Sequence, residues 1–101
     1  MRLEQYELDA IRESFIKNFQ KGKVYLFGSR VDENKKGGDI DLYIDLGDNV
    51  DLKEVMKMKQ DFKLDIYDKI GEQKIDIVIS KDKQSSIVQE ALKKGILLCE
   101  I

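Results

Sequence analysis

The sequence predicts a two-layer α/β fold, in which a short mixed β-sheet carries helices on one face and leaves its other face open. Segments with apolar residues every three or four positions alternate with short aliphatic segments, in the order helix, strand, strand, helix, strand, helix, strand. In two of the strands, acidic residues occupy the face opposite the aliphatic residues. A length of 101 residues suits one domain, and we expect residues 1–101 to form it.

The first helix and the first strand follow from their apolar patterns. A helix is expected over about Leu3–Phe19, whose inward positions are Leu8, Ile11, Phe15 and Phe19. Gly22 follows as a helix terminator. The next segment, Val24–Phe27, contains only apolar and aromatic residues, which is typical of a strand covered on both faces.

A Gly-Ser turn directly after this strand is a candidate phosphate site. Gly28 allows the backbone to turn sharply and to approach a ligand closely. The amides of Ser29 and Arg30, together with the Ser29 hydroxyl, can then point at phosphate oxygens. Gly38, in a Gly-Gly pair, leads into the next strand at the same site. The loop pair Lys35-Lys36 either lies in solvent or adds contacts to the phosphates.

The second strand begins with two acids. Residues 39–45 alternate, so that Asp39, Asp41, Tyr43 and Asp45 share one face and aliphatic residues the other. Asp39 and Asp41 therefore stand about 6–7 Å apart at the backbone, where their like charges repel. A hard cation such as magnesium takes carboxylate oxygens and would remove this repulsion. A solvated strand face is the alternative, but the turn and the acids together favour a nucleoside triphosphate with its metal.

The remaining elements complete the fold. A helix is expected over Asp51–Ile70 and is closed by Gly71. The strand Lys74–Ser80 follows, and a capping box of Ser86 and Gln89 then opens a short helix that Gly95 ends. The tail, residues 96–101, forms a final apolar strand.

An acid in the middle of the third strand is a further candidate. Asp76 is surrounded by isoleucines, where burying an unpaired carboxylate would be costly. If this strand lies beside the second one, Asp76 joins Asp39 and Asp41 as a third metal ligand. The alternative is a solvent-facing acid on an open sheet face.

These residues carry a resemblance. The Gly28-Ser29-Arg30 turn, the polar loop and the run Gly-Gly-Asp-Ile-Asp-Leu over residues 37–42 resemble the DNA polymerase β-type nucleotidyltransferase superfamily. Within it, the chain is most similar to the minimal nucleotidyltransferases of the MNT type, found in prokaryotes beside HEPN or other helical-bundle partners. The resemblance covers nearly the whole chain and implies the nucleotidyltransferase fold.

The resemblance also implies an activity. Asp39 and Asp41 would hold two magnesium ions and the triphosphate, while Gly28 and Ser29 cradle the phosphates. Asp76 would bind the second metal and help deprotonate an acceptor hydroxyl. ATP is the implied donor, so that AMP is transferred and pyrophosphate released. The implied acceptor is a small helical HEPN-type toxin, to which the chain would be the antitoxin.

A second hypothesis needs no catalysis. The chain could be an idle nucleotidyltransferase-fold module that neutralises or positions a helical partner by contact alone. Retention of three carboxylates, each of which needs compensation, favours the enzyme. Binding of magnesium and ATP to the wild type and to Asp39→Asn/Asp41→Asn discriminates between the two.

Composition excludes several other classes of function. A net charge of −2, from 18 basic and 20 acidic residues, gives no general attraction for nucleic acid. Neither a membrane-spanning run nor a signal-peptide pattern is present, and the single cysteine, Cys99, suits a reducing cytoplasm. The chain has no histidine, which rules out histidine bases and makes zinc sites implausible.

Overall fold

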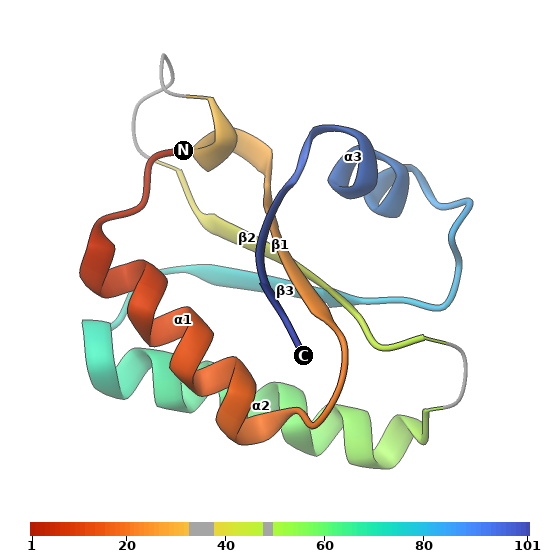
Figure 1. Cartoon of the computed structure of the whole chain (residues 1–101), viewed down its shortest axis with the longest axis horizontal. Helices are drawn as coiled ribbons and strands as arrows, with labels where there is room; N and C mark the ends of the chain where they lie inside the picture. The colour runs from red at the N-terminus through yellow and green to blue at the C-terminus, as the bar shows by residue number, and fades with distance from the viewer. Residues whose placement is uncertain (33–37, 48–49) are drawn as a thin grey trace.

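A computed structural model describes residues 1–32, 38–47 and 50–101 (Figure 1). The order of helices and strands predicted from the sequence is confirmed, and one short 3-10 helix, η1, is added after the first strand. Along the chain the elements are α1 (Gln5–Asn18), β1 (Lys23–Phe27), η1 (Gly28–Val31), β2 (Ile40–Asp45), α2 (Leu52–Ile70), β3 (Ile75–Ile79), α3 (Ser86–Lys94) and β4 (Ile96–Glu100).

The four strands form one mixed sheet in the order β3-β2-β1-β4. β1 runs antiparallel to both β2 and β4, whereas β3 runs parallel to β2. A parallel pair needs a crossover connection, and α2 supplies it. The predicted mixed sheet is thus confirmed, and β2 and β3 are neighbours in it.

The main core lies between the sheet and the helices α1 and α2, which run side by side along one face (Figure 1). Period-two alternation gives β2 three fully buried aliphatic residues on this face, Ile40, Leu42 and Ile44. Three phenylalanines pack beneath them, with ring centroids 5.2 Å apart for Phe15 and Phe19 and 5.6 Å apart for Phe19 and Phe62. These contacts fix the face of β2 that turns toward the helices, and so fix the opposite face for its acids.

The third helix packs on that opposite face (Figure 1). Val88 and Ala91 of α3 form a smaller buried cluster with Phe27 and Tyr43. The expected packing of helices on one face therefore holds for α1 and α2, while α3 covers part of the face that carries the acids. It does so because β1 and β2 place aromatic rings there, which need an apolar cover.

Within the part of the chain that the structure describes, no helix is long and apolar enough to cross a membrane.

Candidate active site

The turn after β1 touches the acid strand directly. Gly28 has a φ of 76°, a conformation that strongly favours glycine. A Cβ atom at this position would collide with Oδ2 of Asp41. Glycine is therefore what allows the backbone of the turn and the carboxylate of Asp41 to lie against each other.

A second glycine makes the same kind of contact from the other side. Gly38 has a φ of 92°, and a Cβ atom there would collide with the hydroxyl oxygen of Ser29. The segment that leads into β2 thus packs on the Gly-Ser turn. Gly28, Ser29 and Gly38, which we predict to bind phosphate, are brought together with Asp41 in one site.

The sheet also brings the third acid to this site. In the parallel pairing of β2 with β3, Asp41 and Asp76 are register partners. Asp39 immediately precedes β2, and its Oδ2 lies 3.3 Å from Nζ of Lys74. All three predicted carboxylates therefore occupy one end of the β2–β3 pair, and Asp76 is exposed there.

The electrostatics of Asp41 reflect this crowding. Burial raises its pKa above the usual 3.8, and the negative charges of Asp76, Asp39 and Glu90 raise it further, against a smaller lowering effect of Lys74. Glu90 lies on α3 and was not predicted from the sequence, because only the packing of α3 on the sheet brings its charge near β2. The negative charges of Asp39, Asp76 and Glu90 thus all act on the carboxylate of Asp41.

Magnesium is the cation that such a set of donors fits. Among residues 1–32, 38–47 and 50–101, no group of three Asp, Glu, Cys or His side chains is already arranged to hold a metal ion. The donors are nevertheless all carboxylate oxygens, which hard cations prefer. A cation bound between Asp39, Asp41 and Asp76 would relieve the repulsion that raises the pKa of Asp41.

Arg30 has its side chain turned toward the N-terminal segment. Its Nη1 donates to the main-chain oxygen of Arg2 at 2.9 Å and lies 3.9 Å from Oε1 of Glu7. Its Nε contacts the main-chain oxygen of Gly38 at 3.4 Å. Of the groups of Arg30, the backbone amide thus remains the candidate phosphate donor. The Lys35-Lys36 pair lies outside the described residues.

A different acid on the same face of β2 is held by a lysine. The Asp45 carboxylate lies 2.9 Å from Nζ of Lys83, which also donates to the hydroxyl of Tyr43 at 3.3 Å. Burial raises the pKa of Asp45, but hydrogen bonds from Lys83 and from the amide of Gly47 outweigh it and leave that pKa lowered. Asp45 is therefore a charged carboxylate paired with Lys83, whereas Asp41 lies among other acids.

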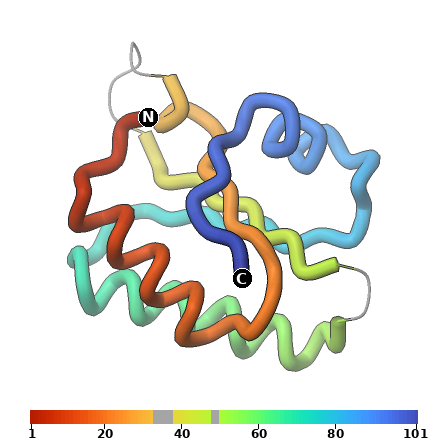
Figure 2. The backbone as a smooth tube through the Cα atoms, viewed as in Figure 1, coloured from red at the N-terminus to blue at the C-terminus, as the bar shows by residue number. Residues whose placement is uncertain are grey.

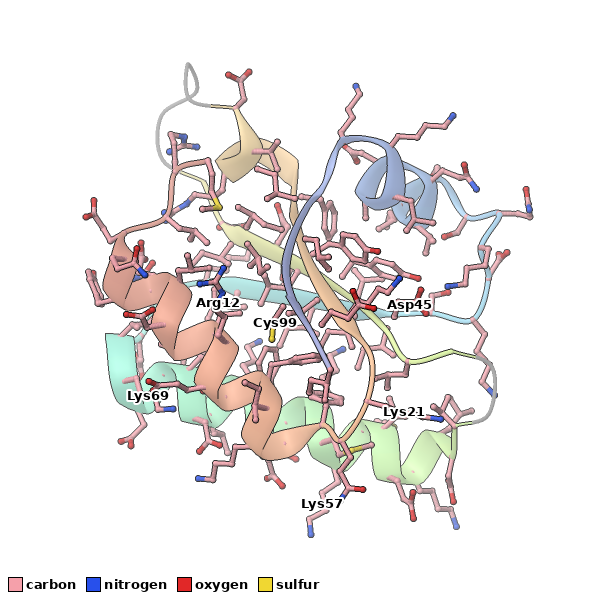
Figure 3. All side chains as sticks on the ribbon, viewed as in Figure 1. Arg12, Lys21, Asp45, Lys57, Lys69 and Cys99 are labelled. Carbon is pink, nitrogen blue, oxygen red and sulfur yellow. The ribbon has the colours of Figure 1, made fainter. Side chains whose placement is uncertain are left out.

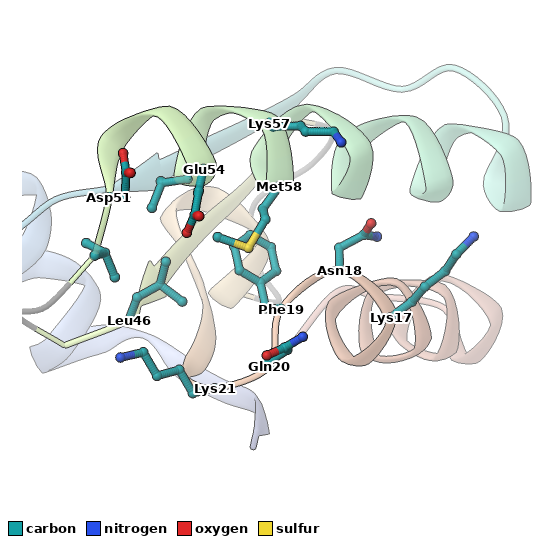
Figure 4. A pocket seen from close by; sticks show the side chains of 12 residues that line it. Lys17, Asn18, Phe19, Gln20, Lys21, Leu46, Asp51, Glu54, Lys57 and Met58 are labelled. Atoms are coloured by element: carbon teal, nitrogen blue, oxygen red, sulfur yellow. The ribbon is translucent and has the colours of Figure 1, made fainter.

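A cavity of about 760 Å³ lies elsewhere, between the end of α1 and the start of α2 (Figure 4). Phe19, Leu46, Val55 and Met58 are among its apolar lining residues, and three lysines, Lys17, Lys21 and Lys57, also line it. None of the three candidate carboxylates lines this cavity. Because it adjoins the residues before β1 and after β2, it lies at the end of the hairpin away from Gly28 and Asp41.

Comparison with known families gives one extended match. The model of the family described as "Polymerase beta, Nucleotidyltransferase" matches residues 9–101. That range includes every candidate site residue named above. Among curated proteins, no relative matches the chain.

Several solved structures share the fold. A mutant of the toxin–antitoxin MntA-HpeT is 20% identical, with a TM-score of 0.66 over 93% of this chain and 73% of the other. The tri-AMPylated HEPN toxin of Shewanella oneidensis in complex with MNT antitoxin also gives 20% and 0.66, over 98% and 74%. A toxin–antitoxin with AMP-PNP is 22% identical, with a TM-score of 0.67 over 93% and 73%. At these identities the likeness establishes the nucleotidyltransferase fold.

Proposed function

The chain belongs to the polymerase beta nucleotidyltransferase family, and from that premise we propose that it transfers AMP from ATP to a hydroxyl group of a small helical partner protein. One observation carries the proposal. The Gly28–Ser29 turn lies against Asp41 and Gly38, which joins a phosphate cradle to a carboxylate cluster. A triphosphate and its metal need both halves within one site.

Each residue of the site has a role in this proposal. The Ser29 hydroxyl and the amides of Ser29 and Arg30 hold the phosphates of ATP, and the glycines allow the close approach. Asp39, Asp41 and Asp76 would hold magnesium, two ions in all, which when bound supplies positive charge that stabilises the attacking and leaving oxygens.

The transfer step is an in-line displacement. The acceptor oxygen attacks the α-phosphorus, a new P–O bond forms, and the bond to pyrophosphate breaks. The proton of the acceptor hydroxyl passes to the carboxylate of Asp76. The exposure of Asp76 supports this role, because an acceptor from another protein can reach it.

The partner is proposed from the neighbouring structures. One of those solved structures is a tri-AMPylated HEPN toxin in complex with MNT antitoxin. Another is a toxin–antitoxin with AMP-PNP. We therefore infer that this chain is the antitoxin of a HEPN-type pair and modifies its toxin. We expect it to act in the cytoplasm, which suits a chain with a single cysteine, and the net charge of −2 gives it no general affinity for nucleic acid.

The test is a labelling experiment. The protein is mixed with a small helical protein of the HEPN type, magnesium and ATP labelled on the α-phosphate. We expect label on the partner with the wild type and none with Asp39→Asn/Asp41→Asn. A partner that binds the wild type but acquires no label would instead identify the chain as an idle binding module.

A further inference from the structure

We propose that Arg2 and Glu7 are positioning residues, which act with Arg30 to hold η1 in the shape that binds the triphosphate. The inference rests on the proposed function and adds two residues that the sequence pattern does not single out. Figure 2 shows the start of the chain running beside η1, the short turn that follows β1. Residues far apart in the sequence therefore meet at the candidate phosphate site.

Arg2 contacts the turn through hydrogen bonds from its main chain and from its side chain. Its amide donates to the oxygen of Arg30 at 2.8 Å. Its side chain donates from Nη2 to the oxygen of Ser29 at 3.1 Å and from Nε to the oxygen of Asp32 at 3.0 Å. The guanidinium of Arg2 thus bridges the main-chain oxygens of Ser29 and Asp32. It thereby fixes the distance between these two carbonyl groups of the turn.

Arg30 completes the arrangement in the opposite direction. Its Nη1 donates back to the oxygen of Arg2 at 2.9 Å, while its Nε contacts the oxygen of Gly38 at 3.4 Å. The turn and the start of the chain therefore hold each other, and the segment before β2 contacts the turn through Arg30.

Glu7 supplies the charge that this arrangement needs. It is only 3% exposed, and its Oε1 accepts from the amide of Glu4 at 2.9 Å and lies 3.9 Å from Nη1 of Arg30. A carboxylate this deeply buried requires a partner. By pairing with Arg30 it orients that guanidinium toward the protein.

The consequence for nucleotide binding is preorganisation. The Ser29 oxygen that accepts from Arg2 shares a peptide group with the Arg30 amide, a proposed phosphate donor. A charged donor on a carbonyl polarises the peptide group and strengthens its N–H as a donor. A turn already held in shape also loses less conformational entropy when ATP binds.

The experiment compares Arg2→Met with Arg12→Met by calorimetric titration of magnesium–ATP. Arg12 is a matched control because its Nε donates to the oxygen of Leu98 at 2.8 Å, so that it also joins the N-terminal region to a main-chain carbonyl (Figure 3). That contact lies at β4, on the other side of β1 from the acids. We expect Arg2→Met to raise the Kd about tenfold, the size of one charge-assisted hydrogen bond, and Arg12→Met to leave it unchanged.

A kinetic readout separates positioning from loss of folded protein. A positioning role raises the KM for ATP and largely retains kcat at saturation, since the three carboxylates are untouched. Partial unfolding would lower kcat with KM unchanged, because fewer molecules are active. The milder variant Glu7→Gln, which keeps the acceptor for the Glu4 amide, should raise KM in the same direction and covers the case of an unstable Arg2 variant.

The outcomes are distinct. An equal Kd for Arg2→Met, Glu7→Gln and Arg12→Met, with binding by the wild type intact, overturns the inference and leaves the proposed function standing. A wild type that does not bind magnesium–ATP at all overturns the proposed function, and the inference with it.

Discussion

Asp41 on β2 and Asp76 on β3 are register partners in neighbouring parallel strands, and the negative charge of Asp76 contributes to a raised pKa at Asp41. Like charges opposite each other destabilise a sheet. The folded protein therefore carries a repulsion at this site, which a bound cation or the loss of a charge would remove.

Asp41→Asn should stabilise the metal-free protein at pH 7, by about 0.5 kcal/mol. Burial and neighbouring charges raise the pKa of Asp41 in the folded state above 3.8, so its charged form is penalised there. The folded state consequently binds more protons than the unfolded state, and wild-type stability falls as the pH rises from about 3.8 through the raised pKa. Urea unfolding in EDTA should show the gain at pH 7 and no gain below pH 3.8.

Asp45→Asn is the matched control for that experiment. Asp45 lies on the same face of β2, but hydrogen bonds from Lys83 and Gly47 outweigh burial and lower its pKa. The corresponding substitution should cost stability at pH 7, where the Asp45 carboxylate is charged and paired. A loss of stability in both variants would contradict the repulsion assigned to Asp41.

Gly28→Ala should abolish magnesium–ATP binding and lower the free energy of unfolding by about 1–2 kcal/mol. The new Cβ would be strained at a φ of 76° and would collide with the carboxylate of Asp41. Gly71→Ala is the control, since Gly71 has a φ of 83° and nothing lies within 4 Å of the position its Cβ would take. It should lose stability through strain alone and keep full binding; equal loss of binding in both variants would contradict the site.

Ser29→Ala should weaken magnesium–ATP binding by about 1–3 kcal/mol, the range for a hydrogen bond to a charged group. The loss should be partial because the backbone amides remain. Ser85→Ala is a suitable control, since the Ser85 hydroxyl accepts from the amide of Val88 and caps α3. Calorimetry that gave an unchanged Kd for Ser29→Ala would move the phosphate contacts to Lys35 and Lys36.

Asp76→Asn should leave magnesium–ATP binding largely intact and lower AMP transfer by orders of magnitude, because only the attacking side of the reaction is damaged. The measurement is the rate at which label from ATP appears on the helical partner. Glu90→Gln also removes a negative charge that acts on Asp41, but Glu90 has no assigned role and should retain transfer within a few-fold. Wild-type rates from Asp76→Asn would remove this residue from the mechanism.

Much of the fold could be predicted because its signals are local. Apolar spacing in α1 and α2 and the period of two in β2 and β3 depend only on neighbouring residues. The same period placed Asp39 and Asp41 on one face of β2. That Asp76 joins them depended on β2 and β3 being neighbours, which the structure shows. At a helix end the local signal is weaker: we predicted Ser86 as the cap of α3, whereas the structure has Ser85.

The remaining features depend on contacts between distant segments. The Arg2 side chain reaches a turn 27 residues away, and Lys83 reaches Tyr43 across 40 residues. No spacing within a helix or strand encodes such pairs. The expectation that all helices pack on one face was wrong for α3 for the same reason, since Val88 and Ala91 find their partners on β1 and β2.

Calorimetric titration of the nucleotide shows whether the carboxylates bind magnesium–ATP. The wild type and Asp39→Asn/Asp41→Asn are each titrated with ATP, in magnesium and in EDTA. We predict binding only by the wild type and only in magnesium. The double variant should be folded but should give no heat of ATP binding. The same Kd for both proteins in magnesium would contradict the assignment of the site.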